Sequence, residues 1–147
     1  DPAHAARAGG ASTEPPGVAE LRAALDTCTR TVGGDHALTA LTMNNLAYVL
    51  KAAAVGGRVD SSSAFPEAED LYRRSLSARQ MLLGPAHPDT VVTAHNLAEL
   101  LGAQQRDEEA NAIRTEIMDL LGHSLGDGEE GADAGTQEAQ VKGEGGR

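Results

Sequence analysis

The sequence predicts an all-α protein, a short α-solenoid in which helix–turn–helix units stack side by side. Two observations lead to this prediction. The stretch NNLAYVL at residues 44–50 returns as HNLAELL at residues 95–101, and long internal repeats are typical of stacked helical units. Within both stretches the apolar residues recur at i, i+3, i+4 and i+7, which is the spacing of one face of an α-helix.

The repeat extends well beyond these stretches. Residues 36–52 and 87–103 match at eight of seventeen positions at a constant offset of 51, whereas Ala68 and Ala110 pair at an offset of 42. The nine-residue difference falls in residues 55–63, VGGRVDSSS, whose composition is typical of a loop. The sequence therefore predicts a 42-residue unit that is lengthened once by a loop insertion at 55–63.

Taken in chain order, the first segment is residues 1–17. It holds three prolines and three glycines without a large apolar side chain, so we expect a disordered lead-in. Residues 18–34 follow as a half unit, which matches the second helix of a pair. The tail at 127–147 is acidic and glycine-rich, and it cannot bury enough apolar surface to offset its ordering entropy. We expect this tail to be disordered as well.

The full units are residues 36–84 and 87–126, which complete an array over residues 18–126. Pro66 suits a first helical turn, and Gly84-Pro85 suits the end of a helix. Small and aliphatic residues recur where the helices are expected to pack against each other. The predicted packing residues are Leu46, Ala47, Leu50, Ala68, Leu97, Ala98, Leu101 and Ala110.

Composition excludes several classes of function. The chain carries a net charge of −10 and only three aromatic residues, so we expect no binding of nucleic acid, whose phosphates would be repelled. No apolar run approaches the roughly 20 residues that span a bilayer, so we expect no membrane segment. The single Cys28 forms no internal disulfide, which favours a reducing, cytoplasmic location.

No catalytic constellation is present, so we expect no enzyme activity within these residues. The five histidines lack the spacing of a zinc motif, and repetition alone explains His36 and His87 as equivalent positions before two helices. We therefore expect neither a metal site nor a cofactor.

Four stretches resemble a known repeat family: NNLA (44–47), EAEDLYRRSL (67–76), LGPAHPDT (83–90) and HNLA (95–98). They are similar to the tetratricopeptide repeat (TPR), in the 42-residue variety found in kinesin light chains. The resemblance covers about residues 18–126. It implies a protein–protein interaction module, with a cargo adaptor as the leading specific role.

A helical wheel places a second set of residues opposite or beside the packing stripe. The resemblance implies that these positions line a concave groove, in which Asn45 and Asn96 bind the backbone of an extended partner peptide. An amide side chain suits this task because it offers a donor and an acceptor. The alternative is that each asparagine only satisfies a neighbouring helix end. The groove candidates are Leu41, Asn44, Asn45, Tyr48, Val92, His95, Asn96 and Glu99.

Two other functions remain open at this point. The chain could be a structural fragment or subunit of a larger TPR-containing assembly or multidomain protein, docking through the open helical end at residues 18–32. Further TPR units would then be its partners. An enzyme would require a catalytic domain elsewhere in a longer parent chain.

Overall fold

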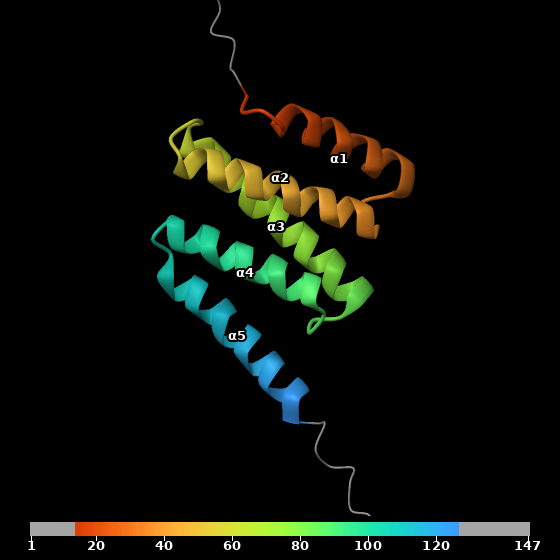
Figure 1. Ribbon diagram of the computed structural model, residues 1–147, viewed down its shortest axis with the longest axis vertical. Helices are drawn as coiled ribbons and strands as arrows, with labels where there is room; N and C mark the ends of the chain where they lie inside the picture. The colour runs from red at the N-terminus through yellow and green to blue at the C-terminus, as the bar shows by residue number, and fades with distance from the viewer. Residues whose placement is uncertain (1–13, 127–147) are drawn as a thin grey trace, which may run out of the picture.

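The computed structural model describes residues 14–126, and this part of the chain folds into five α-helices without a strand. The helices stack in chain order along the long axis of the molecule (Figure 1). The predicted all-α solenoid is therefore confirmed. The helices are α1 (Val18–Val32), α2 (Ala37–Val55), α3 (Ser61–Leu83), α4 (Pro88–Ala103) and α5 (Asp107–Gly126).

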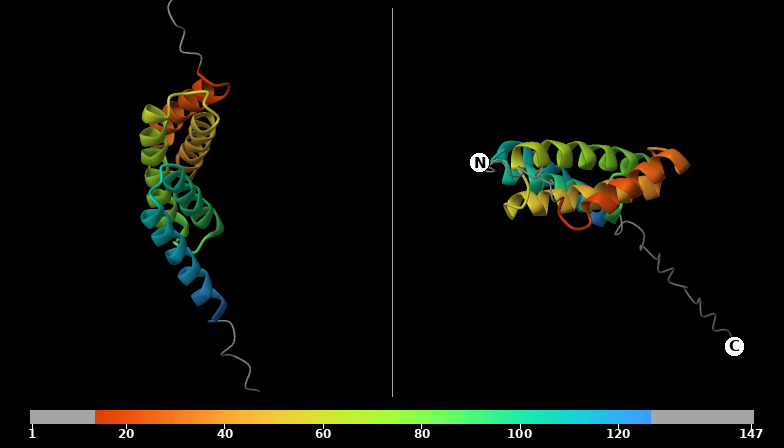
Figure 2. Two further views of the ribbon diagram at one scale, coloured as in Figure 1. Left: turned by 90° about the vertical axis from the view of Figure 1, so that its left-hand side faces the viewer. Right: turned by 90° about the horizontal axis from the view of Figure 1, so that it is seen from above.

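The helices form two antiparallel pairs, α2 with α3 and α4 with α5, and α1 packs on the other side of α2. Figure 2 shows α2 and α3 on opposite sides of the stack. The helices α2 and α4 also contact each other directly. One face of the array is consequently built from α2 and α4.

Side chains just before the helices fix where three of them begin. His36 accepts a hydrogen bond from the amide of Leu38 through Nδ1, and His87 accepts one from the amide of Asp89 in the same way, both at 3.1 Å. Asp60 accepts from the amide of Ser62 at the start of α3. Each contact satisfies an amide that has no partner inside its helix. The equivalence of His36 and His87 in the repeat thus has a structural cause.

The loop predicted at residues 55–63 is shorter in the structure. Helix α2 continues through Val55 and α3 begins at Ser61, so the connection covers only residues 56–60. Asp60 explains the difference, because its carboxylate accepts hydrogen bonds from both the amide and the hydroxyl of Ser62. Capping by Asp60 outweighs the poor helix propensity of the serine run.

Pro66 likewise lies further inside its helix than predicted. It is the sixth residue of α3 rather than part of the first turn. A proline there removes the hydrogen bond that its nitrogen would donate to the carbonyl of Ser62. Ser62 is exposed to solvent, and water can satisfy that carbonyl. The helix therefore tolerates Pro66 close to its start.

The two predicted disordered ends lie largely outside the described residues. Residues 1–13 and 127–147 are not described, whereas residues 14–17, assigned to the lead-in, form a turn before α1. Pro15 is buried there, and its carbonyl accepts a hydrogen bond from the amide of Val18 at 3.1 Å. Glu14 also forms an ion pair with Arg22 of α1 at 2.7 Å. These contacts place the start of the ordered region before Val18.

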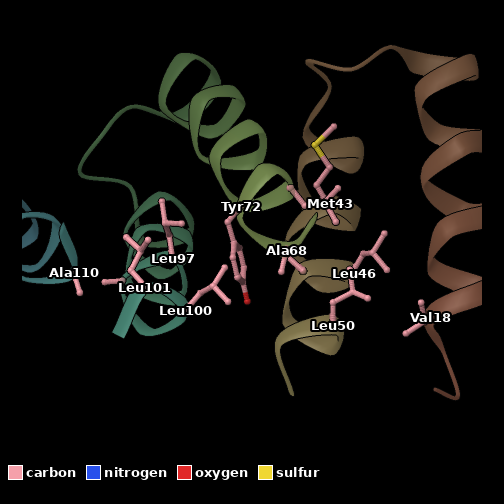
Figure 3. Close-up of a cluster of buried hydrophobic side chains, with 13 residues drawn as sticks. Val18, Met43, Leu46, Leu50, Ala68, Tyr72, Leu97, Leu100, Leu101 and Ala110 are labelled. Carbon is pink, nitrogen blue, oxygen red and sulfur yellow. The ribbon is translucent and has the colours of Figure 1, made fainter. Parts of the chain in front are cut away.

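A continuous apolar core runs through the stack from Val18 of α1 to Ala110 of α5 (Figure 3). Tyr72 of α3 is fully buried and lies between the leucines of α4 and the apolar side chains of α2 (Figure 3). Each helix pair buries the apolar stripe of its neighbour, as repeat architectures require. All eight predicted packing residues are buried, at 3% exposure or less.

Ion pairs join the units on the side of the stack formed by α3 and α5. Arg106, in the turn before α5, contacts Glu69 of α3 at 2.6 Å and Glu109 of α5 at 2.7 Å. Arg73 contacts the same Glu69 at 2.8 Å. Burial raises the pKa of Glu69, but the hydrogen bonds from Arg106 and Arg73 outweigh this effect, so its pKa lies below the usual value.

Candidate functional site

The candidate groove is the solvent-facing surface of α2 and α4. From α2 it displays Leu41, Asn45 and Tyr48, and from α4 it displays Val92 and Glu99. These side chains are exposed because they lie opposite the buried stripe of each helix, at the i, i+4 and i+7 spacing of one helical face. We call this surface the α2–α4 face.

Three asparagines form a chain of side-chain amides across this face. Asn96 Nδ2 donates to Asn44 Oδ1 at 3.3 Å, and Asn44 Nδ2 donates to Asn45 Oδ1 at 3.4 Å. We call this arrangement the amide relay. Asn44, a groove candidate in the sequence analysis, is buried at 8% exposure. Its position between the helices lets it orient the other two amides.

The relay leaves a hydrogen-bond acceptor at one end and a hydrogen-bond donor at the other. Among the described residues, Asn96 Oδ1 and Asn45 Nδ2 have no hydrogen-bond partner. Asn96 is half-buried and Asn45 is exposed. The surface therefore presents an acceptor from α4 and a donor from α2. A peptide backbone offers the matching donor and acceptor.

An ion pair crosses the same face closer to the C-terminal ends of the helices. Lys51 Nζ lies 2.7 Å from Glu99 Oε2 and 5.4 Å from the centre of the Tyr48 ring. His95 Nε2 lies 3.4 Å from the other oxygen of Glu99. The hydrogen bond from Lys51 is the main reason that the pKa of Glu99 lies below its usual range. Tyr48, His95 and Glu99 thus form one cluster with Lys51.

Lys51 was not among the residues predicted from the sequence. It follows Tyr48 by three positions and so lies on the same helical face, which is a signal that could have identified it. Lys51, Glu99 and Arg114 of α5 also line a hollow of about 620 Å³ where the helices end. The face thus ends in a depression that carries three charged side chains.

At the opposite end of the face the structure forms a second hollow, of about 380 Å³. It lies between the start of α2, the end of α3 and the start of α4. Leu41 is the groove candidate that reaches it, and Val92 lies outside its lining. This hollow was not predicted from the sequence, because it depends on how the end of α3 meets the other two helices.

Among residues 14–126, no group of histidines, cysteines and acids is arranged to hold a metal ion. Cys28 is half-buried, with Sγ 3.9 Å from the hydroxyl oxygen of Thr42. None of the described helices is long and apolar enough to cross a membrane.

Comparison with known proteins finds one similar family. Residues 63–121, which cover most of α3, all of α4 and most of α5, match the tetratricopeptide repeat family. None of the curated proteins compared with the chain matches it. Tetratricopeptide repeats generally serve as protein-interaction modules rather than enzymes. Residues 63–121 are thus similar to tetratricopeptide repeats, and the described residues form a short all-α solenoid.

Proposed function

We propose that this protein binds an extended segment of a partner protein on the α2–α4 face, with Asn45 and Asn96 holding the backbone of that segment. The observation that carries the proposal is the amide relay. Its outer ends present one donor and one acceptor to solvent. The relay also limits the rotation of both amides, which lowers the entropy that a partner must overcome on binding.

The surroundings of the relay support a peptide ligand. Leu41, Tyr48 and Val92 are 44%, 53% and 52% exposed, so apolar surface flanks the amides on both helices. A peptide lying there would bury these side chains while its backbone contacts the amides. Backbone contacts supply affinity and flanking side chains supply preference in such modes of recognition.

The finer role that we propose is that of a kinesin light chain-like adaptor, which connects a cargo protein to other components. The sequence stretches LGPAHPDT and EAEDLYRRSL support this role by their resemblance to that family. We also propose a reducing, cytoplasmic location, because the single Cys28 forms no internal disulfide.

The experiment starts from random-sequence peptides displayed on phage and selected on the wild-type protein. Selected peptides are then titrated against the double variant Asn45→Ala with Asn96→Ala. We expect the affinity to fall by about ten-fold or more, because two hydrogen bonds to the ligand disappear. Asn111→Ala is the matched control, since Asn111 is an exposed asparagine on α5. If the folded double variant keeps the wild-type affinity, the groove mechanism is wrong.

A second candidate function is docking to another helical element. The observation that favours it is apolar surface on α5, where Met118 and Leu121 are 70% and 40% exposed. Docking through residues 18–32, which the sequence suggested, stays a prediction, and Val32 in that helix is 42% exposed. Light scattering on the wild-type protein and on Met118→Lys measures whether the chain associates with itself through α5. A monomer both before and after the substitution argues against self-association through α5.

A further inference from the structure

Four of the eight residues that line the hollow between α2, α3 and α4 are leucines, and no described element covers them fully. We call this hollow the leucine pocket. Its volume of about 380 Å³ falls within the range of roughly 300–1,000 Å³ that is typical of ligand-binding pockets. The leucines that line it are 40% to 50% exposed: Leu38, Leu41, Leu82 and Leu83.

The charges at the pocket are arranged with the cation inside and the anion outside. Arg79 is buried at 6% exposure, and its Nη1 donates to the main-chain oxygen of Asp89 at 2.6 Å and to Thr93 Oγ1 at 3.0 Å. The Asp89 side chain lines the pocket and is exposed. Its carboxylate has no ion pair among the described residues.

A ligand therefore meets the charge of Asp89 before that of Arg79. Asp35, which precedes the pocket residue His36, is a further exposed acid without an ion pair in the described region. The whole chain also carries a net charge of −10, which favours the approach of a basic ligand. Arg79 also lines the pocket, but its Nη1 is already engaged by the main-chain oxygen of Asp89 and by Thr93 Oγ1.

We propose that the leucine pocket takes an apolar side chain of the partner segment, and that a neighbouring lysine or arginine of this segment pairs with Asp89. This inference rests on the proposed peptide-binding function and extends it. Leu41 belongs to both the pocket and the α2–α4 face, so one bound segment can reach both. The partner segment should therefore contain an apolar residue next to a lysine or an arginine.

The probes are three synthetic peptides of equal length, built from alanine and serine except for one central pair. The pair is leucine–lysine, leucine–glutamate or serine–lysine. Binding to the full chain is followed by NMR of labelled leucine methyl groups. We expect the leucine–lysine peptide to shift the methyl signals of the pocket leucines, and to bind about two- to five-fold more tightly than the leucine–glutamate peptide. The serine–lysine peptide should leave those signals in place.

The variant Asp89→Asn should remove the preference for lysine over glutamate while the pocket methyls still shift. Asp119→Asn is the matched control, because Asp119 is an exposed acid on α5 without an ion pair in the described region. Equal or reversed preference in the wild-type protein would overturn the proposal. So would methyl shifts confined to leucines outside the pocket, or an unchanged preference in Asp89→Asn.

The test of the leucine pocket and the test of the amide relay can fail independently. Loss of affinity in the Asn45→Ala, Asn96→Ala variant together with no lysine preference would leave the groove standing and refute the pocket. A lysine preference that depends on Asp89, combined with no effect of the double variant, would refute the groove mechanism instead.

Discussion

The hydroxyl of Tyr72 offers a sharp test of how this core is held together. The side chain is fully buried, and Oη has no hydrogen-bond partner among the described residues. A buried polar group without a partner costs about 1–3 kcal/mol. The substitution Tyr72→Phe removes the hydroxyl and keeps the ring that packs between α2 and α4. We therefore expect the variant to be more stable than the wild-type protein.

The magnitude follows from two opposing contributions. Removing the hydroxyl recovers the desolvation cost, but it leaves a void of about 10–15 Å³, roughly one small atom. At about 24 cal/mol per Å³ this void costs about 0.3 kcal/mol. The net gain in the free energy of unfolding is then about 0.7–2.7 kcal/mol. A gain of 1 kcal/mol would raise the melting temperature by about 4 °C in a domain of this size.

The assay is urea and thermal unfolding of the full chain, followed by circular dichroism. Tyr48→Phe is the matched control, because Tyr48 is 53% exposed and its substitution should change stability by less than about 0.5 kcal/mol. A loss of stability in Tyr72→Phe would show that the hydroxyl has a partner, such as an internal water. The Tyr72 hydroxyl would then not be an unsatisfied group, and the expected gain in stability would be refuted.

The pH dependence of stability gives an independent check. Burial raises the pKa of Tyr72 well above its ordinary value of 10.0. Above about pH 10 the unfolded chain loses this proton while the folded chain keeps it, so the wild-type protein loses stability as the pH rises. Tyr72→Phe lacks this loss, and its advantage should grow above about pH 10. An advantage that stays constant with pH would contradict the assignment.

Three further predictions concern caps, ion pairs and packing. His87→Ala should cost about 1 kcal/mol of stability, because it removes the side chain that caps α4. His87→Asn should keep most of the wild-type stability, because asparagine is also a good capping residue. Equal losses of stability in urea unfolding of the two variants would refute the capping role of His87. The pKa of Glu69 is lowered from 4.5, so the stability it contributes is present above about pH 4.5 and is lost as the pH falls through its folded-state pKa. Glu69→Gln, which breaks the ion pair with Arg106, should flatten the acid limb of the stability curve. Ala98→Leu should cost about 1–3 kcal/mol by overpacking a fully buried position, while the exposed Ala103→Leu should be nearly neutral, as melting temperatures will show.

The sequence identified most of the fold because the relevant signals are local and repeated. The spacing of Leu46, Ala47 and Leu50 specifies which side of a helix is buried, and the same spacing at residues 97–101 shows that the unit recurs. Small residues at Ala68 and Ala110 mark where helices approach closely. The helix boundaries were predicted less accurately, because capping by the single carboxylate of Asp60 decides where α3 begins.

The candidate site was predicted only in part. Exposure of Leu41, Asn45 and Tyr48 follows from helical periodicity alone. The position of Asn44 does not, because periodicity placed it at the margin of the exposed face, and the packing of α4 against α2 decides that it becomes buried. Lys51 was missed for a related reason, since its partner Glu99 lies on another helix.

The sequence by itself determined the helices, their repetition and the side of each that is buried, since these depend on spacing along one chain segment. The tertiary structure alone decided which polar groups meet. The relay through Asn44, the orphaned hydroxyl of Tyr72 and the leucine pocket beside Asp89 all depend on how helices distant in sequence are rotated and offset against each other. A shift of one residue in that packing would change every one of these contacts and leave the helical pattern of the sequence unaltered.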